Sequence, residues 1–160
     1  TSTLGLYDSR SFRAAGSVGG TRTALTATAL SLNTHYRGST ATNLAMTIPS
    51  AAAGDIGDWI TVFYDTIINN GQTHTFTTTT DAAFAPGSTI VRMGGAIAST
   101  ADVATTDDNI ITLAGDTDGD CGIGTTLKFL NTTGATNGWA VEVVVTNQGD
   151  GTEARASAFS

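Results

Sequence analysis

The chain has one cysteine and no long apolar run, and each of these two scarcities excludes a class of protein. Cys121 is the only cysteine, so an intramolecular disulfide framework is excluded. We expect Cys121 to serve simply as a small residue within a glycine-rich loop. No stretch approaches the roughly 18 apolar residues that span a bilayer, so we expect no membrane partner. Positive charge is scarce too, because 7 Lys and Arg stand against 14 Asp and Glu. This balance argues against binding a phosphate backbone, and we expect no nucleic-acid partner.

Catalytic signatures are also missing. The two histidines, His35 and His74, lie in a polar stretch and in an alternating strand pattern, where we expect ordinary surface residues. The sequence has no Gly-x-Ser-x-Gly elbow, His-Glu-x-x-His zinc pattern, P-loop or dinucleotide fingerprint. We therefore expect that the protein is not an enzyme.

The residues that are abundant favour strands over helices. Hydrophobic residues make up 40% of the chain and charged residues 13%, and β-branched threonine is common. Short apolar or alternating runs separated by turn residues predict eight strands. They are Thr23–Leu32, Leu44–Ile48, Trp59–Tyr64, His74–Thr79, Thr89–Met93, Ile110–Leu113, Thr126–Leu130 and Trp139–Val145.

Three patterns carry more detailed expectations. The nearly continuous apolar run Trp59–Tyr64 predicts a central strand covered on both faces, and Asn69-Asn70-Gly71 predicts a hairpin to the next strand. The threonine run 75–80 predicts either a polar edge strand or part of a subunit interface. Alternation in Trp139–Val145 predicts that one face of this strand is buried and that the other, which carries Glu142, is partly exposed to solvent. The aromatic residues in strand patterns are expected in the core: Trp59, Phe63, Tyr64, Phe129 and Trp139.

These strands predict an all-β fold: a single antiparallel β-sandwich with a jelly-roll-like path, for which a Greek-key barrel is the alternative. Residues 98–109 have no apolar period and are expected to form a loop. Residues 1–22 are expected to form an extended N-terminal arm, and residues 23–160 to form the sandwich domain with a short C-terminal tail. Phe159 in that tail is either a loose end or an anchor on a neighbouring subunit.

The arm is the best candidate for a binding site, because charge is unevenly distributed. Residues 1–37 hold four of the seven basic side chains and one acid, whereas the remainder holds three basic and 13 acidic side chains. A segment without a strand or helix period is ordered mainly by what it binds. The expected contacts are apolar anchors and charge-assisted bonds from Leu6, Tyr7, Arg10, Phe12, Arg13 and Arg22.

A second candidate site is the loop Gly115–Gly124. Asp116, Asp118 and Asp120 alternate in it, and three carboxylates can converge on Ca²⁺, a hard cation that prefers oxygen. The glutamate and flanking helices of an EF-hand are missing, so a solvated turn is the simpler interpretation. No cofactor other than this possible Ca²⁺ is expected.

Several stretches together resemble the small decoration, or cement, proteins of tailed-bacteriophage capsids. They are Thr23–Leu32, Trp59–Phe63, Gly122-Ile123-Gly124, Gly138-Trp139 and the run Met46-Thr47-Ile48-Pro49-Ser50-Ala51-Ala52-Ala53-Gly54. This last run resembles the "xTLPxAxxG" stretch of that family. The resemblance covers residues 23–146, and the long arm departs from the family.

The resemblance implies a non-enzymatic virion protein on the outer capsid surface, assembled as a homotrimer and bound to the major capsid protein so that it stabilises the shell. The arm then supplies part of the attachment. The alternative is an extracellular or receptor-binding β-sandwich module that binds carbohydrate through its loops.

Overall fold

The computed structural model describes residues 22–38, 42–78, 84–93, 100–105, 107–115, 121–146 and 159, and these residues are nearly all in β-structure. One 3-10 helix, Ala51–Ala53, is capped by the Ser50 side chain, which accepts from the Ala52 amide. The strands, in sheet order, are β1 (Thr23–Ala24), β2 (Thr34–Arg37), β4 (Trp59–Phe63), β9 (Thr126–Asn131), β10 (Trp139–Thr146), β6 (Thr89–Met93) and β7 (Thr100–Val103) in a seven-stranded sheet, and β3 (Leu44–Ile48), β5 (Thr73–Thr78) and β8 (Ile110–Ala114) in a three-stranded sheet.

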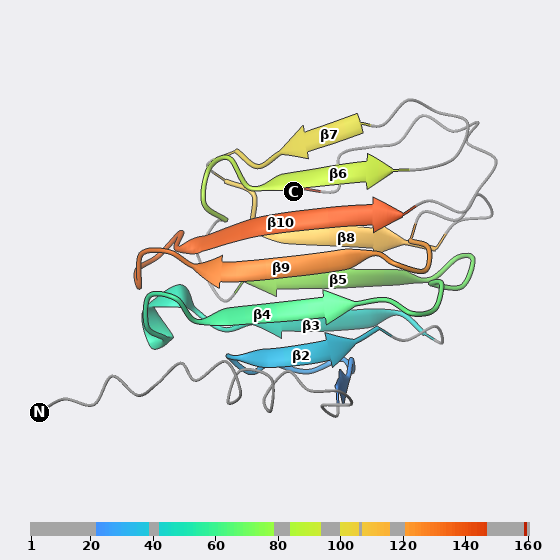
Figure 1. Cartoon of the computed structure of the whole chain (residues 1–160), viewed down its shortest axis with the longest axis horizontal. Helices are drawn as coiled ribbons and strands as arrows, with labels where there is room; N and C mark the ends of the chain where they lie inside the picture. Colours follow the sequence, from blue (N-terminus) through green and yellow to red (C-terminus); the bar gives the residue numbers. More distant parts are fainter. Residues whose placement is uncertain are drawn as a thin grey trace, which may run out of the picture.

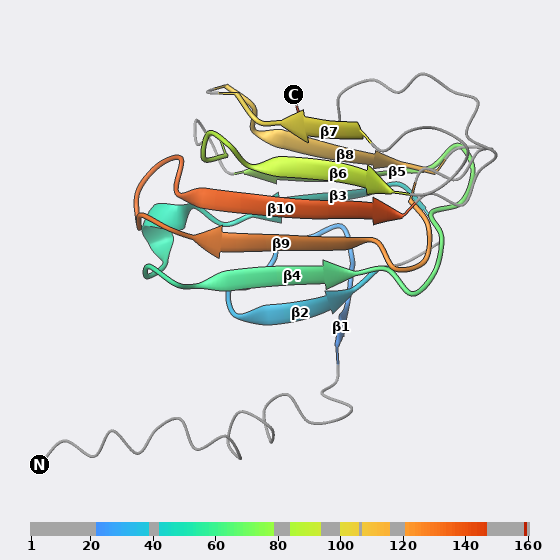
Figure 2. The same ribbon diagram turned by 45° about the horizontal axis from the view of Figure 1, so that its top comes forward.

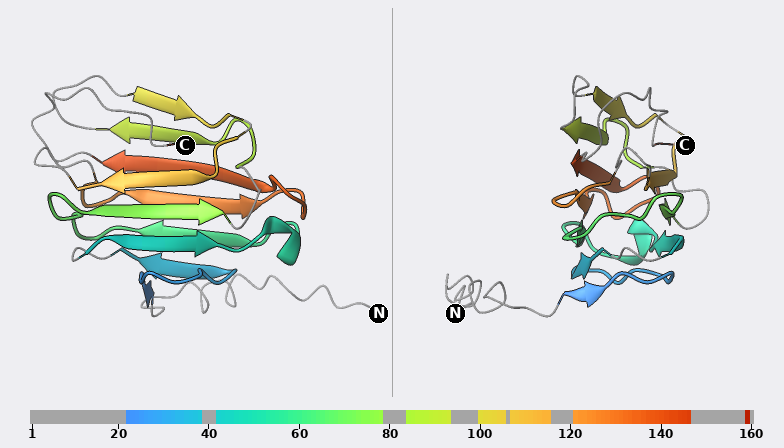
Figure 3. Two further views of the ribbon diagram at one scale, coloured as in Figure 1. Left: turned by 180° about the vertical axis from the view of Figure 1, so that it is seen from behind. Right: turned by 90° about the vertical axis from the view of Figure 1, so that its right-hand side faces the viewer.

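The two sheets lie face to face as two layers. In Figure 1 the seven-stranded sheet is in front, and β3, β5 and β8 run behind its central strands. Figure 3 shows the three-stranded sheet from behind and the two layers edge-on. The smaller sheet covers one face of the larger sheet, and no other element of the described residues covers the opposite face.

The core fills the space between the layers, because alternate side chains of each strand point inward. In β10, the side chains of Trp139, Val141, Val143 and Val145 are buried, whereas Glu142 is exposed, as the sequence predicts. Opposite them, Phe76 of β5 lies 6.0 Å from Phe129 of β9, measured between ring centroids. The two sheets are therefore joined by interlocking apolar rows.

The strands are not all antiparallel, and this part of the sequence-based fold prediction is wrong. Four pairs are parallel: β1 with β2, β2 with β4, β3 with β5, and β6 with β10. Two of these pairs follow from the path from β2 to β5, which changes sheets at every strand, so that β4 returns beside β2 and β5 beside β3. A strand of the opposite sheet thus serves as the crossover that parallel neighbours require.

Four of the predicted connections and strand positions also differ. The predicted strand Thr23–Leu32 is reduced to β1 and an isolated bridge at Ala29, and β2 follows it where no strand was expected. The predicted loop 98–109 contains β7. The predicted hairpin is wrong because β4 and β5 belong to different sheets. The threonine-rich strand β5 is central in its sheet and not an edge.

Each edge strand of the smaller sheet forms an isolated bridge to another segment of the chain. Ala29 forms a parallel bridge to Thr47 of β3, and Phe159 forms an antiparallel bridge to Ile111 of β8. Phe159 is 5% exposed and lies 5.9 Å from the ring of Phe84. The terminal phenylalanine is thus neither a loose end nor an anchor on a neighbour; it packs into its own core and protects a strand edge.

Candidate functional site: the open face of the seven-stranded sheet

The side of the seven-stranded sheet that faces away from the smaller sheet is the most extensive uncovered sheet surface in the described part of the chain. We call it the outer face, and Figure 2 shows the strands that form it. Its side chains alternate with the buried ones along each strand. They are His35, Arg37, Trp59, Thr61, Phe63, Thr89, Val91, Ala101, Val103, Thr126, Lys128, Leu130, Ala140, Glu142 and Val144, with Arg22 beside them.

Strand register arranges these side chains in rows that cross the sheet. In the middle row, His35 of β2 lies opposite Thr61 of β4, which lies opposite Lys128 of β9, and Glu142 of β10 follows. Thr89 of β6 completes the row on the far side of β10. Polar groups therefore form a line across five neighbouring strands, and cross-strand neighbours of this kind interact directly.

Positive charge is concentrated on this face. Of the Lys and Arg side chains that the structure describes, Arg22, Arg37 and Lys128 all lie here. Two carboxylates lie against them: Arg37 Nε is 2.5 Å from Asp65 Oδ2, and Lys128 Nζ is 3.2 Å from Glu142 Oε2. The described side chains of this face therefore carry three cations and two carboxylates, a charge of +1, in a chain whose formal charge is −7.

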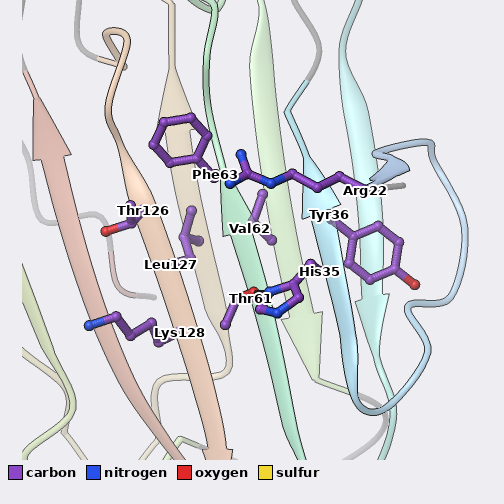
Figure 4. A pocket seen from close by; sticks show the side chains of 9 residues that line it. All are labelled: Arg22, His35, Tyr36, Thr61, Val62, Phe63, Thr126, Leu127 and Lys128. Atoms are coloured by element: carbon purple, nitrogen blue, oxygen red, sulfur yellow. Dashed lines mark hydrogen bonds between the residues drawn. The ribbon is translucent and has the colours of Figure 1, made fainter. Parts of the chain in front are cut away.

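Arg22 is the unpaired cation of the three among the described residues, and it stacks on an aromatic ring. Its guanidinium carbon lies 4.8 Å from the centroid of Phe63 (Figure 4), a cation–π contact worth about 0.5–1 kcal/mol at an exposed site. Thr23 then pairs with Tyr36 of β2. Hence the chain enters the sheet at one end of the outer face, immediately after the predicted arm.

Two shallow hollows lie on either side of Lys128. The first, about 170 Å³, is lined by Arg22, His35, Thr61 and Phe63 among others (Figure 4). The second, about 340 Å³, lies beyond β9. Its lining includes Pro86, Leu130, Ala140, Glu142 and Lys128. Both hollows are open rather than enclosed, so they suit the contours of a macromolecule better than a buried small molecule.

Two aromatic side chains expected in the core belong to this face instead. Trp59 and Phe63 are half-buried and alternate with buried Ile60 and Val62, so β4 is not covered on both faces as predicted. The prediction holds for Tyr64, Phe129 and Trp139, which are buried. An apolar run shows which side chains favour burial. It does not show which side of the strand is covered by the second sheet.

His35 is exposed, as predicted, and its ring is held between neighbours. It lies 4.4 Å from the Trp59 ring between centroids, and its Nδ1 hydrogen-bonds to the Thr61 hydroxyl. Among the described residues, no carboxylate contacts the His35 ring or the Thr61 hydroxyl. The arrangement is a polar and aromatic contact patch.

His74 is fully buried, and the expected surface position is wrong. Its Nδ1 lies 2.8 Å from the Tyr64 hydroxyl, and its Nε2 lies 3.1 Å from the Thr42 carbonyl. Because a carbonyl only accepts, Nε2 donates to Thr42, and Nδ1 accepts from Tyr64. Burial lowers the pKa of His74, although the hydrogen bond to Thr42 opposes the shift. The pair is sealed beneath the sheet, away from the outer face.

The thiol of Cys121 is equally inaccessible. Its residue is 1% exposed, and burial raises the pKa of the thiol to about 12, with a hydrogen bond from Thr125 acting in the opposite direction. A thiolate is the reactive form, so this cysteine is inert at neutral pH. It matches the expected small residue in a tight loop.

The remaining sequence-predicted site residues lie outside the described part of the chain. This holds for Leu6, Tyr7, Arg10, Phe12 and Arg13 of the arm. It also holds for the three aspartates of the possible calcium loop, Asp116, Asp118 and Asp120. The described residues contain no group of three or more His, Cys, Asp or Glu side chains that could hold a metal ion. Of the predicted contacts, the structure places Arg22.

Sequence reasoning missed the outer face, although part of its signal was available. Alternation of buried and exposed residues in β9 and β10 puts Lys128 and Glu142 on the wet sides of their strands. What joins them to His35 and Thr61 is the pairing of β2, β4 and β9, and these strands are far apart in the sequence. No local pattern encodes that pairing.

Comparison with known proteins identifies no relative of this chain. No protein-family model matches it, no curated protein sequence matches it, and no solved structure matches its fold. Within the residues that the structure describes, no helix is long and apolar enough to cross a membrane.

Proposed function

We propose that this protein is a non-enzymatic structural component of a bacteriophage virion. It binds the outside of the capsid, contacts the major capsid protein and stabilises the shell. It acts as a homotrimer that is attached partly through its N-terminal arm. The fold has two mixed sheets. The jelly-roll-like path of the chain, which was inferred from the sequence, is part of this proposal.

One observation carries the proposal: the chain enters the body at the open, cation-bearing face of the larger sheet. Arg22 lies over Phe63 on that face, and the predicted arm, residues 1–22, leads into it. An arm that starts at an exposed flat surface can bind the same partner that the surface contacts.

The chemistry of the body supports a binding role. His74 and Cys121 are buried and neutral at physiological pH, and neither is available to a substrate. His35 contacts an aromatic ring and a threonine hydroxyl. The groups that do reach the surface are arranged as a broad, shallow patch, which is the form that protein contacts take.

The test is co-sedimentation with undecorated shells of the tailed phage that encodes the chain. The informative variant changes the apolar anchors of the arm, Leu6, Tyr7 and Phe12, to alanine. We expect at least a tenfold loss of shell binding, since buried aromatic anchors dominate binding energy at protein interfaces. The folded body is unaffected, because these residues precede β1.

The matched control replaces Ser2, Ser9 and Ser11 of the same arm with alanine. This control keeps the length of the arm and its apolar groups, so shell binding should be retained. Equal binding by the wild type and the Leu6/Tyr7/Phe12 variant would show that the arm does not attach the protein. Absence of binding by the wild type would contradict the capsid role itself.

A carbohydrate-binding module is the second candidate, and the exposed side of Trp59 favours it. This ring is half-buried, stacks with His35 and lies in the row of Leu130. Sugars commonly pack on such aromatic faces. A glycan array separates the two functions: a specific sugar signal that disappears in Trp59→Ala or Asp116→Ala supports the module, and shell binding without sugar supports the capsid protein.

A further inference from the structure

The first hollow of the outer face, shown in Figure 4, is lined by basic side chains in an acidic chain. Its lining includes Arg22, His35 and Lys128, and none of the described residues that line it is acidic. The chain as a whole holds 14 acidic and 7 basic side chains, so this lining runs against its balance. We propose that the hollow binds the carboxylate of an acidic side chain on a partner protein. The partner, but not the site, rests on the proposed function.

Strand register builds the hollow. Its floor is a row of paired residues whose side chains point into the core, namely Tyr36, Val62 and Leu127. The outward row on one side contains His35 and Thr61, and the row on the other side contains Phe63 and Thr126. Such rows are about 6.6 Å apart, because they lie two residues apart along each strand. The hollow, about 170 Å³, therefore admits one functional group rather than a whole small ligand.

Two donor groups at the hollow have no acceptor among the described residues. Arg22 stacks on Phe63, with its guanidinium carbon 4.8 Å from the ring centroid, so the N–H groups at its edge stay available. His35 bonds to the Thr61 hydroxyl through Nδ1, and with that hydroxyl donating, Nε2 carries the hydrogen and is a donor. Figure 4 shows the guanidinium and the imidazole on either side of Val62. An acceptor between them can bond to both.

The charge of the site matches a carboxylate. Arg22 is a cation that no described carboxylate neutralises, whereas Lys128 Nζ lies 3.2 Å from Glu142 Oε2. A carboxylate carries one negative charge, and its two oxygens accept well from a guanidinium fork. A phosphate group carries about −1.5 to −2 at neutral pH, so a single cation leaves it partly uncompensated. The site therefore favours a carboxylate over a phosphate.

Two other hollows provide an internal comparison. The second hollow of the outer face is lined by both Lys128 and Glu142, which form an ion pair. A further hollow at the end of β2 is lined by Arg37 and Asp65, which form another. In both, a carboxylate of the same chain already binds the cation. The hollow of Arg22 has no such residue in its described lining, so its acceptor is expected from a partner.

The surroundings of the hollow favour a protein as the source of that acceptor. The hollow is shallow and open, and apolar side chains lie on the same face, with Trp59 half-buried and Leu130 47% exposed. An Asp or Glu side chain from an apposed surface can enter it while apolar groups of the two proteins meet around it. A charged pair of this kind fixes the register of two surfaces. In the proposed function, the apposed surface belongs to the major capsid protein.

The experiment titrates the full chain with sodium acetate and follows its amide nitrogen–hydrogen NMR spectrum, with sodium chloride at equal ionic strength as the reference. Arg22→Gln removes the guanidinium fork. His35→Phe keeps an aromatic ring beside Trp59 and removes both ring nitrogens. The matched control, Arg37→Gln, removes the same charge from a guanidinium that is bound to Asp65 and does not line the hollow. Circular dichroism confirms that each variant is folded.

We expect saturable acetate shifts around the hollow in the wild type and in Arg37→Gln. Acetate affinity should be roughly tenfold weaker in Arg22→Gln and in His35→Phe, because each loses a hydrogen bond to a charged group. Shifts equal to those in sodium chloride, or equal losses in the Arg22 and Arg37 variants, overturn the site. Tighter binding of sodium phosphate than of acetate overturns the choice of a carboxylate. Tighter binding of sodium glucuronate, lost in Trp59→Ala, assigns the site to an acidic sugar and overturns the protein partner.

Shell co-sedimentation separates the partner from the site. We expect roughly tenfold weaker shell binding by Arg22→Gln and retained binding by Thr75→Val, which changes an outward threonine of the smaller sheet. If the wild type binds acetate and shells but Arg22→Gln binds shells equally well, the acidic partner is overturned and the proposed function stands. If the wild type binds acetate but no shells, the proposed function and its capsid partner fail together, and the carboxylate site remains.

Discussion

At His74 the fold holds an ionisable ring entirely away from water. Gly38 makes this possible, because a Cβ atom there would lie 2.2 Å from the ring of Tyr64, whose hydroxyl donates to His74. The neutral ring is satisfied on both nitrogens, by Tyr64 and by the Thr42 carbonyl. Protonation adds a charge in a dry site and removes the acceptor that Tyr64 uses.

The stability of the fold should therefore fall in mild acid. Burial lowers the pKa of His74 in the folded state, so its neutral form contributes stability above the unfolded-state value of about 6.5. As the pH falls below that value, the unfolded chain binds the proton first and the free energy of unfolding decreases. Urea unfolding at pH 7.5 and pH 5.5 measures the difference.

Two variants assign this pH dependence. His74→Gln should remove it and cost about 1–3 kcal/mol at pH 7.5, since Tyr64 and Thr42 lose well-placed partners. His35→Gln changes the exposed histidine and should keep the wild-type pH dependence. A wild type whose unfolding is the same at both pH values would contradict the assigned role of His74.

Cys121 offers a chemical test of the same interior. Its thiol, with a pKa raised to about 12, should react with a thiol reagent at pH 8 far more slowly in the folded protein than in urea. The unfolded chain supplies the control for reagent and concentration. Rapid native modification would mean that the loops around residues 64–68 and 121–125 open readily.

Among the elements, β8 depends on a residue from the far end of the chain. Phe159 bridges to Ile111 and packs against Phe84, so it both fills the core and covers a strand edge. We expect Phe159→Ala to reduce the free energy of unfolding by about 3 kcal/mol, because a buried phenylalanine leaves a cavity. Phe159→Leu keeps most of the volume and should cost about 1 kcal/mol.

Chemical denaturation of the two variants, with the wild type beside them, gives these values directly. If alanine at position 159 is tolerated as well as leucine, the tail does not contribute to the core. A loss of trimer without a loss of monomer stability would instead restore the anchor on a neighbouring subunit.

Local sequence patterns predicted the positions of the strands better than they predicted which strands pair. Seven of the eight predicted strands have a counterpart within a few residues, and β10 has the predicted alternation. The hairpin from β4 to β5 failed because the turn at Gly71 leads the chain into the other sheet. The turn residues specify a change of direction, whereas the available apolar surface decides which sheet is joined.

For the whole molecule, the proposed homotrimer links stability to association. Because association draws the folded state toward the oligomer, the melting temperature of the wild type should rise with protein concentration. Scanning calorimetry at about 0.1 and about 10 mg/ml measures the shift, and a melting temperature that does not depend on concentration would count against the homotrimer.

By itself the sequence determined that the chain is β-rich, that its strands lie near the predicted positions and that its N-terminal end is basic. These features are local, since each depends on side-chain type and spacing within a few residues. Tertiary structure decided the parallel pairs, the burial of His74, the docking of Phe159 and the outer face that joins His35, Thr61, Lys128 and Glu142. Those features depend on which distant strands pair and on which sheet face is covered, and no local pattern contains either.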